Sequence, residues 1–209
     1  MNQKGTFGVC VSTFAAALCI LGCSPEKSQD KAQPVFSRVP SSSSGINFRN
    51  DLTEGYDTWF DVFAYVYNGG GVAIGDINND GLPDVYFTGN EVPNRLYLNK
   101  GGLRFEDITT AAQVGGNGKW NNGVTMVDIN SDGLLDIYVC KGGWGDTEAQ
   151  RANLLFVNQS DLTFKEQAAD YGLSESGYSI HASFFDMDND NDLDVYVTNR
   201  PDSFDLPLS

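Results

Sequence analysis

A nine-residue acidic segment occurs three times in this chain, at residues 76–84, 128–136 and 186–194. In every copy, oxygen-bearing side chains stand at the first, third, fifth and ninth positions. The sixth position, where the segment must turn sharply, holds glycine twice and asparagine once, the two residue types that best tolerate positive φ. The copies begin 52 and 58 residues apart, so the fold must repeat one unit that contains this turn.

The spacing of these oxygens is that of a calcium loop. Calcium takes about 6–8 oxygen ligands at roughly 2.3–2.6 Å, and a tight turn can supply them from alternate side chains and from the backbone carbonyl of the seventh residue. Carboxylates packed this densely repel one another unless a cation is present. The alternative is an ordinary turn rich in Asp, Asn and Gly, which would explain one copy more easily than three in register. The predicted ligands of about three calcium ions, one per loop, are Asp76, Asn78, Asp80, Leu82, Asp84, Asp128, Asn130, Asp132, Leu134, Asp136, Asp186, Asp188, Asp190, Asp192 and Asp194.

The residues around the loops are typical of strands rather than helices. An EF-hand would need a glutamate at its twelfth position and a helix on each side. Here the twelfth position is Phe87, Val139 or Val197, and the flanking residues are rich in β-branched and aromatic types. Each loop is therefore predicted to close a β-hairpin.

Two further strand-like segments follow each of the first two loops. They are residues 94–99 and 103–107 in the first unit and 153–158 and 162–166 in the second. In the third unit the loop is followed by 195–198, the second strand of its hairpin, and these further segments have no counterpart. Four-stranded units at this period are typical of propeller blades. We predict an all-β fold, a partial β-propeller of about three four-stranded blades with the last incomplete, in which the Asp-rich calcium loops lie in hairpins.

The first unit also resembles a known family. Residues 71–86 are similar to the FG-GAP/VCBS repeat of integrin-α-type propellers, and residues 67–71 together with 94–100 resemble more narrowly the bacterial surface proteins of the ASPIC/UnbV type. The resemblance covers roughly residues 45–200. It implies calcium-binding hairpin loops on one rim of a propeller, but it says little about function, because one fold carries many roles.

A closed propeller needs about 4–8 blades, and this sequence supplies two and part of a third. Either the chain is an amino-terminal fragment of a longer protein, or another chain supplies the missing blades. Because an open arc would leave strand edges unpaired, we favour the fragment.

The amino-terminal region is predicted to be a targeting segment and a tether. Residues 1–22 read as a lipoprotein signal peptide, with an apolar stretch at 7–21 and a lipobox that ends at Cys23, the predicted site of lipidation. A plain secretory signal is the alternative. Residues 23–44 are polar and rich in Ser, Lys, Gln and Pro, which predicts a flexible tether, and residues 45–209 hold the propeller repeats. We expect an exported protein, lipid-anchored at a bacterial outer membrane or cell surface through Cys23 alone.

The formal net charge is −15, and the three loops supply much of it. Three calcium ions would leave the chain acidic. An acidic chain has no basic face on which to bind a nucleic acid, so nucleic-acid partners are excluded.

The sequence offers no catalytic constellation. Its single histidine, His181, is expected at the start of a blade strand with a structural role, and the one cysteine outside the amino-terminal region, Cys140, is expected in the core. Trp120 and Trp144 are expected to pack between blades, although a tryptophan in a loop can also stack on a sugar. The repeated tyrosines two residues after each loop are also expected in the core. They are Tyr86, Tyr138 and Tyr196.

These features favour a non-enzymatic module that binds an extracellular protein or glycan, with calcium in a structural role. The alternative is a larger secreted enzyme that acts on polysaccharide and whose catalytic residues lie outside this chain.

Overall fold

The computed structural model describes residues 35–56, 64–116, 120–143 and 146–201. The chain divides into two compact units, residues 1–37 and 38–209. In the first unit only residues 35–37 are described, and they are exposed and outside any helix or strand. The predicted signal peptide, the lipobox with Cys23 and Trp144 lie outside the described residues. Within the described ranges, none of the helices has the length and apolar character needed to cross a membrane.

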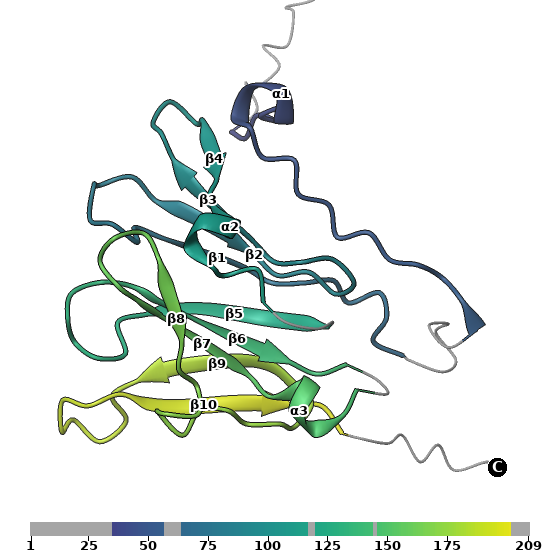
Figure 1. Cartoon of the computed structure of the whole chain (residues 1–209), viewed down its shortest axis with the longest axis vertical. Helices are drawn as coiled ribbons and strands as arrows, with labels where there is room; N and C mark the ends of the chain where they lie inside the picture. The colour runs from purple at the N-terminus through teal and green to yellow at the C-terminus, as the bar shows by residue number, and fades with distance from the viewer. Residues whose placement is uncertain (1–34, 57–63, 117–119, 144–145, 202–209) are drawn as a thin grey trace, which may run out of the picture. The chain divides into compact units, whose positions relative to one another are not determined.

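The second unit consists of antiparallel sheets that follow one another along the chain (Figure 1). The first sheet contains β1 (Val72–Gly75), β2 (Asp84–Phe87), β3 (Arg95–Asn99) and β4 (Phe105–Asp107). The second contains β5 (Asn121–Val127), β6 (Asp136–Lys141), β7 (Leu154–Asn158) and β8 (Phe164–Glu166), and the third contains β9 (Ser179–Phe185) and β10 (Asp194–Asn199). The described helices are single turns: α1 (Ser41–Ser44), α2 (Thr109–Ala112) and α3 (Glu148–Arg151). The predicted all-β fold is confirmed, with two four-stranded blades and an incomplete third.

Each acidic loop joins the first two strands of its sheet, as predicted. The register pairs the residue before the loop with the ninth loop residue, as in Gly75 opposite Asp84. The same pairing joins Val127 to Asp136 and Phe185 to Asp194. The loops therefore occupy equivalent places at the carboxyl ends of β1, β5 and β9.

The first strands of neighbouring sheets approach one another closely. A Cβ atom on Gly71, just before β1, would lie 2.7 Å from the carbonyl oxygen of Asn122 in β5, so no side chain fits there. The Thr125 hydroxyl of β5 donates to the carbonyl of Ala182 in β9 at 2.7 Å. These contacts fix the spatial order β1, β5, β9, in which each sheet neighbours the next.

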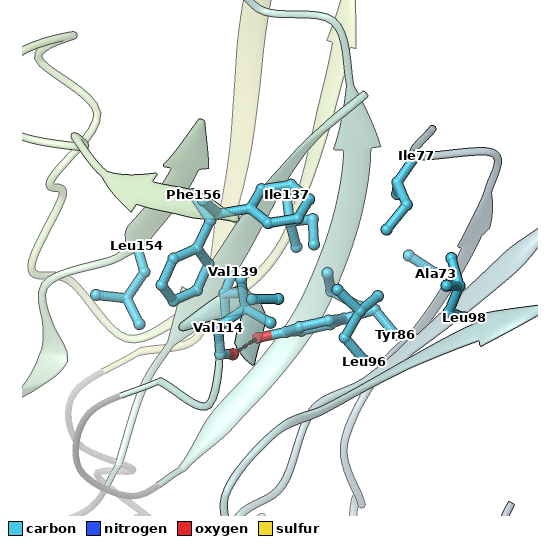
Figure 2. Packing of buried hydrophobic residues seen from close by; sticks show 13 residues of the cluster. Ala73, Ile77, Tyr86, Leu96, Leu98, Val114, Ile137, Val139, Leu154 and Phe156 are labelled. Atoms are coloured by element: carbon cyan, nitrogen blue, oxygen red, sulfur yellow. Dashed lines mark hydrogen bonds between the residues drawn. The ribbon is translucent and has the colours of Figure 1, made fainter. Parts of the chain in front are cut away.

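Apolar side chains fill the space between the sheets (Figure 2). Tyr86 and Leu96 of the first sheet are fully buried, as are Ile137 and Val139 of the second. Burial of such a side chain stabilises the fold by roughly 1.5–3 kcal/mol. A second cluster, with Tyr138, Cys140, Leu155, Val157, Ala168 and Ala182, lies between the second and third sheets. Cys140 is thus a core residue, as predicted, and burial raises the pKa of its thiol to about 12.

The described residues before the first blade are irregular apart from short turns. Residues 46–48 form no strand, and residues 64–67 form a turn. The predicted tether ends in the helical turn α1, closed by Gly45 at φ 79°, and Ser44 is buried. Local composition missed these features because they depend on packing: the ring of Phe48 stacks on that of Phe87, with centroids 5.1 Å apart.

Candidate metal-binding loops

The first residue of each loop holds the turn together. The two carboxylate oxygens of Asp76 accept hydrogen bonds from the backbone N–H groups of Asp80, at 3.1 Å, and Gly81, at 2.7 Å. Asp80 in turn accepts from the N–H of Leu82 at 2.8 Å. The loop therefore curls around its own aspartates, and their backbone partners set where the carboxylates lie.

The other two loops repeat this arrangement. Asp128 accepts from the N–H groups of Asp132 and Gly133 at 3.0 and 2.9 Å. Asp186 accepts from those of Asp190 and Asn191 at 3.2 and 3.1 Å. The three segments that the sequence identified as copies therefore share one conformation.

Two residues of each loop adopt left-handed backbone conformations. The sequence predicted this for the sixth position, and Gly81, Gly133 and Asn191 have φ of 82°, 84° and 69°. It missed the fourth position, where Asn79, Ser131 and Asn189 have φ of 57°, 59° and 64°. Asparagine at two of these three sites was the available signal, because it tolerates this region.

The ninth residue anchors its loop to the rest of the blade. Asp84 is fully buried, and its oxygens accept from the N–H of Ile77 at 3.0 Å and from the N–H of Asn99, at the end of β3, at 2.8 Å. Burial raises the pKa of Asp84, and its two backbone hydrogen bonds oppose that shift. Asp136 repeats the pattern with Ile129 and Asn158, and burial raises its pKa too. Sequence reasoning missed the role of these two asparagines, although both end the same strand of their unit.

The third loop gathers carboxylates most closely. One oxygen each from Asp186, Asp188 and Asp194, at positions one, three and nine, lies within 4.8 Å of the others. Oxygens bound to one calcium ion at roughly 2.3–2.6 Å cannot lie more than about 5 Å apart, so this cluster fits the ion. The neighbouring Asp190 and Asp192 shift in opposite directions: a side-chain hydrogen bond with Asp190 raises the pKa of Asp192, and a backbone hydrogen bond from Asp192 lowers the pKa of Asp190.

In the first two loops the third position is asparagine. The amide of Asn78 donates to Asp80 at 3.0 Å, and that of Asn130 donates to Asp132 at 2.9 Å, so the third and fifth positions are in contact. The amide of Asn79 also donates to the carbonyl of Gly133 at 2.9 Å, which brings the first two loops side by side. The backbone carbonyls of Leu82, Leu134 and Asp192 stay predicted ligands.

A hollow of about 370 Å³ lies at the opposite ends of the same strands. Its lining includes Asn122, His181 and Arg200. The Arg200 guanidinium lies 4.0 Å from the ring centre of Tyr178 and 5.2 Å from that of Tyr65. His181 lies in β9, as expected, and faces this hollow. Trp120, expected between blades, is buried in a small cluster with Val66, Leu52 and Tyr65, which precede the first blade.

The chain belongs to the β-propeller class by its fold. Its four-stranded sheets repeat along the chain as blades, and an acidic loop lies in the same hairpin of each sheet. Within the chain, residues 76–139 match the FG-GAP-like repeat, a span that contains the first two acidic loops.

The chain is also similar to cartilage acidic protein 1. It is 30% identical to the protein from Xenopus tropicalis over 135 residues, which is 64% of this chain and 20% of that relative. It is 28% identical to the protein from Homo sapiens over 156 residues, which is 72% of this chain and 23% of that relative. The match thus spans about a fifth of the length of these curated relatives. The FG-GAP-like repeat suggests an adhesion-like β-propeller module.

Proposed function

We propose that this chain is a calcium-binding β-propeller segment of an exported cell-envelope lipoprotein, which serves as a binding or adhesion module without catalysis of its own. The observation that carries the calcium assignment is the close approach of Asp186, Asp188 and Asp194 in a loop whose conformation the other two loops share. Each loop would hold one ion through the side chains at positions one, three, five and nine and the carbonyl at position seven.

Calcium would act structurally in this protein. Each loop places three or more carboxylates at the end of a hairpin, and their mutual repulsion destabilises the folded state without a cation. A bound ion would remove that repulsion and hold the first two strands of each blade in register. Extracellular calcium modules bind at about 10⁻⁴–10⁻³ M, and we expect affinities in this range.

The partner would be an extracellular protein or glycan that binds at a rim of the propeller. The hollow near Asn122, His181 and Arg200 supports this proposal, since its lining combines polar side chains with several glycines. The predicted signal peptide and the predicted lipidation of Cys23 are the sequence features behind a proposed location at a bacterial outer membrane or cell surface. We also propose the narrower kinship with ASPIC/UnbV-type surface lipoproteins on the residues quoted above.

A calcium titration of the full chain tests the proposal. We expect about three ions per chain by equilibrium dialysis, and about one fewer in Asp80→Ala, because Asp80 is a proposed ligand of the first loop alone. Asp170→Ala removes an exposed carboxylate far from the loops in sequence and should leave the stoichiometry unchanged. If wild-type chain binds no calcium at millimolar concentration, or if Asp80→Ala binds as many ions as wild type, the assignment is wrong.

A further inference from the structure

The first two acidic loops are hydrogen-bonded to each other at the surface. The amide of Asn79, at the fourth position of the first loop, donates at 2.9 Å to the carbonyl of Gly133, at the sixth position of the second. The N–H of the same peptide group belongs to Leu134 and donates to Asp132 at 2.8 Å. Asp132 and the carbonyl of Leu134 are proposed ligands. The side chain of Asn79 therefore holds a peptide group that lies between two ligands of the neighbouring loop.

A second connection between the same two loops is made by a buried asparagine. The amide of Asn158, at the end of β7, donates to the carbonyl of Ile77 in the first loop at 2.8 Å and to that of Leu135 in the second at 3.2 Å. The backbone N–H of Asn158 donates to Asp136 at 2.8 Å. The N–H of Ile77 donates to Asp84 at 3.0 Å. One side chain thus joins the segments that hold the ninth residue of each loop.

The third loop is not joined to the second in this way. Ser131 and Asn189 stand where the first loop has Asn79, and their φ angles of 59° and 64° are close to its 57°. Among the described residues, neither side chain makes a hydrogen bond, and none connects residues 128–136 with 186–194. The chain therefore contains a connected pair of loops and a third loop of the same conformation that can serve as a reference.

We propose that the first and second loops bind calcium as a coupled pair, in which occupation of one loop raises the affinity of the other through Asn79 and Asn158. The inference rests on the proposed calcium function and adds a form of regulation to it. A loop that holds an ion must stay in one conformation, which costs conformational entropy. Because the side chains join the two loops, ordering one also orders the other, and the second binding step costs less.

Repulsion between the two ions acts against this coupling. An ion in the first loop adds positive charge near the second loop, which lowers the affinity of the second loop for its own ion. At 0.15 M ionic strength, exposed charges that are more than about 8 Å apart are largely screened. A titration at this ionic strength therefore measures mainly the coupling that the side chains carry.

Amide hydrogen exchange of the full chain over a series of free calcium concentrations reports on each loop separately. Asp80→Ala removes a proposed ligand of the first loop alone. In this variant, the calcium concentration that half-protects the second loop should rise about fivefold, at the lower end of usual coupling strengths, and that of the third loop should stay unchanged. Because coupling is reciprocal, Asp132→Ala should raise the midpoint of the first loop by the same factor.

Two matched variants locate the connection. Glycine tolerates the left-handed backbone at the fourth position, so Asn79→Gly removes the surface hydrogen bond without straining the turn. In the Asn79→Gly chain, Asp80→Ala should raise the midpoint of the second loop by only about twofold, since one hydrogen bond fewer joins the loops. Asn189→Gly makes the same change in the third loop, and the fivefold effect of Asp80→Ala should persist there. In chelator, exchange of the second loop should be the same with and without Asp80→Ala.

The possible outcomes separate this inference from the proposed function. If calcium protects none of the three loops, both are wrong. If calcium protects the loops but Asp80→Ala leaves the midpoint of the second loop unchanged, the calcium sites stand and the coupling is overturned. The coupling is also overturned if Asn79→Gly leaves the full effect of Asp80→Ala in place, or if Asp80→Ala already alters exchange of the second loop in chelator.

Discussion

The second and third sheets carry the same acidic loop but differ in what lies outside it. In the second, β7 covers β6, and Asp136 and Tyr138 are fully buried. In the third, no described strand covers β10, and Asp194 is partly exposed and Tyr196 largely so. The backbone hydrogen bonds within the two loops are nevertheless the same in kind. The loop conformation is therefore local, whereas burial of its ninth residue and of the tyrosine depends on the third strand of the blade.

The largest difference between the two sheets should appear at the ninth loop residue. Asp136→Ala removes the acceptor of two backbone N–H groups, the partly buried one of Ile129 and the buried one of Asn158, at about 1–3 kcal/mol each. We expect it to lower the free energy of unfolding in chelator by about 2–4 kcal/mol, and Asp194→Ala by about 1 kcal/mol or less. Urea unfolding of both variants measures the two values. Equal losses would show that the third strand contributes nothing to this anchor.

The repeated tyrosine should show a smaller difference of the same sign. The Tyr138 hydroxyl donates to the partly buried carbonyl of Leu173 at 3.0 Å and accepts from the buried Asn153 amide at 2.9 Å. Tyr138→Phe removes both hydrogen bonds and leaves the Asn153 amide with Ser179, to which it also donates at 3.0 Å. We expect a loss of about 1–2 kcal/mol in the free energy of unfolding. Tyr196→Phe should change it by less than about 0.5 kcal/mol, as is usual at exposed sites. A comparable loss in both variants by urea unfolding would contradict the contrast in burial.

Cys140 offers the comparison with the smallest effect on stability. The property that should differ there is the reactivity of a thiol towards alkylation. Burial raises its pKa to about 12, so the thiol stays protonated and inaccessible in the folded chain at pH 8. Since the folded pKa exceeds the ordinary value of 9.0, this group's contribution to stability is complete below pH 9 and is lost as the pH rises towards 12.

Thr198 occupies the equivalent position in β10 and is exposed, so Thr198→Cys should react with iodoacetamide at least a hundredfold faster than Cys140 in the same chain. Peptide mass spectrometry of the alkylated sites measures the two rates, and urea should abolish the difference. Similar rates in the folded chain would mean that the second core cluster opens as readily as the edge strand.

The loops and their hairpins could be predicted from the sequence because their contacts are local. Oxygen spacing, the turn residues at position six and the β-branched flanks all act within about fifteen residues. The anchoring role of Asn99 and Asn158 could not be deduced in that way. Each contacts an aspartate that is far away in the sequence, and only the register of the third strand in each sheet brings the two residues together.

The expectation that Tyr196 lies in the core was wrong for a related reason. Equal register positions have equal surroundings only when the neighbouring strands are also equal, and the third sheet lacks the counterpart of β3 and β7 in the described residues. Sequence repetition thus predicted the conformation of a unit better than its burial.

The most direct test of the central claim is a thermal melt of the full chain in millimolar calcium and in excess chelator. A ligand that binds only the folded state at a hundredfold excess over its dissociation constant stabilises it by about 2.7 kcal/mol per site. We predict one cooperative transition that moves up by many degrees with calcium, and a smaller shift in Asp80→Ala. A cooperative transition at the same temperature in both conditions would contradict the account and would leave the three loops as ordinary turns.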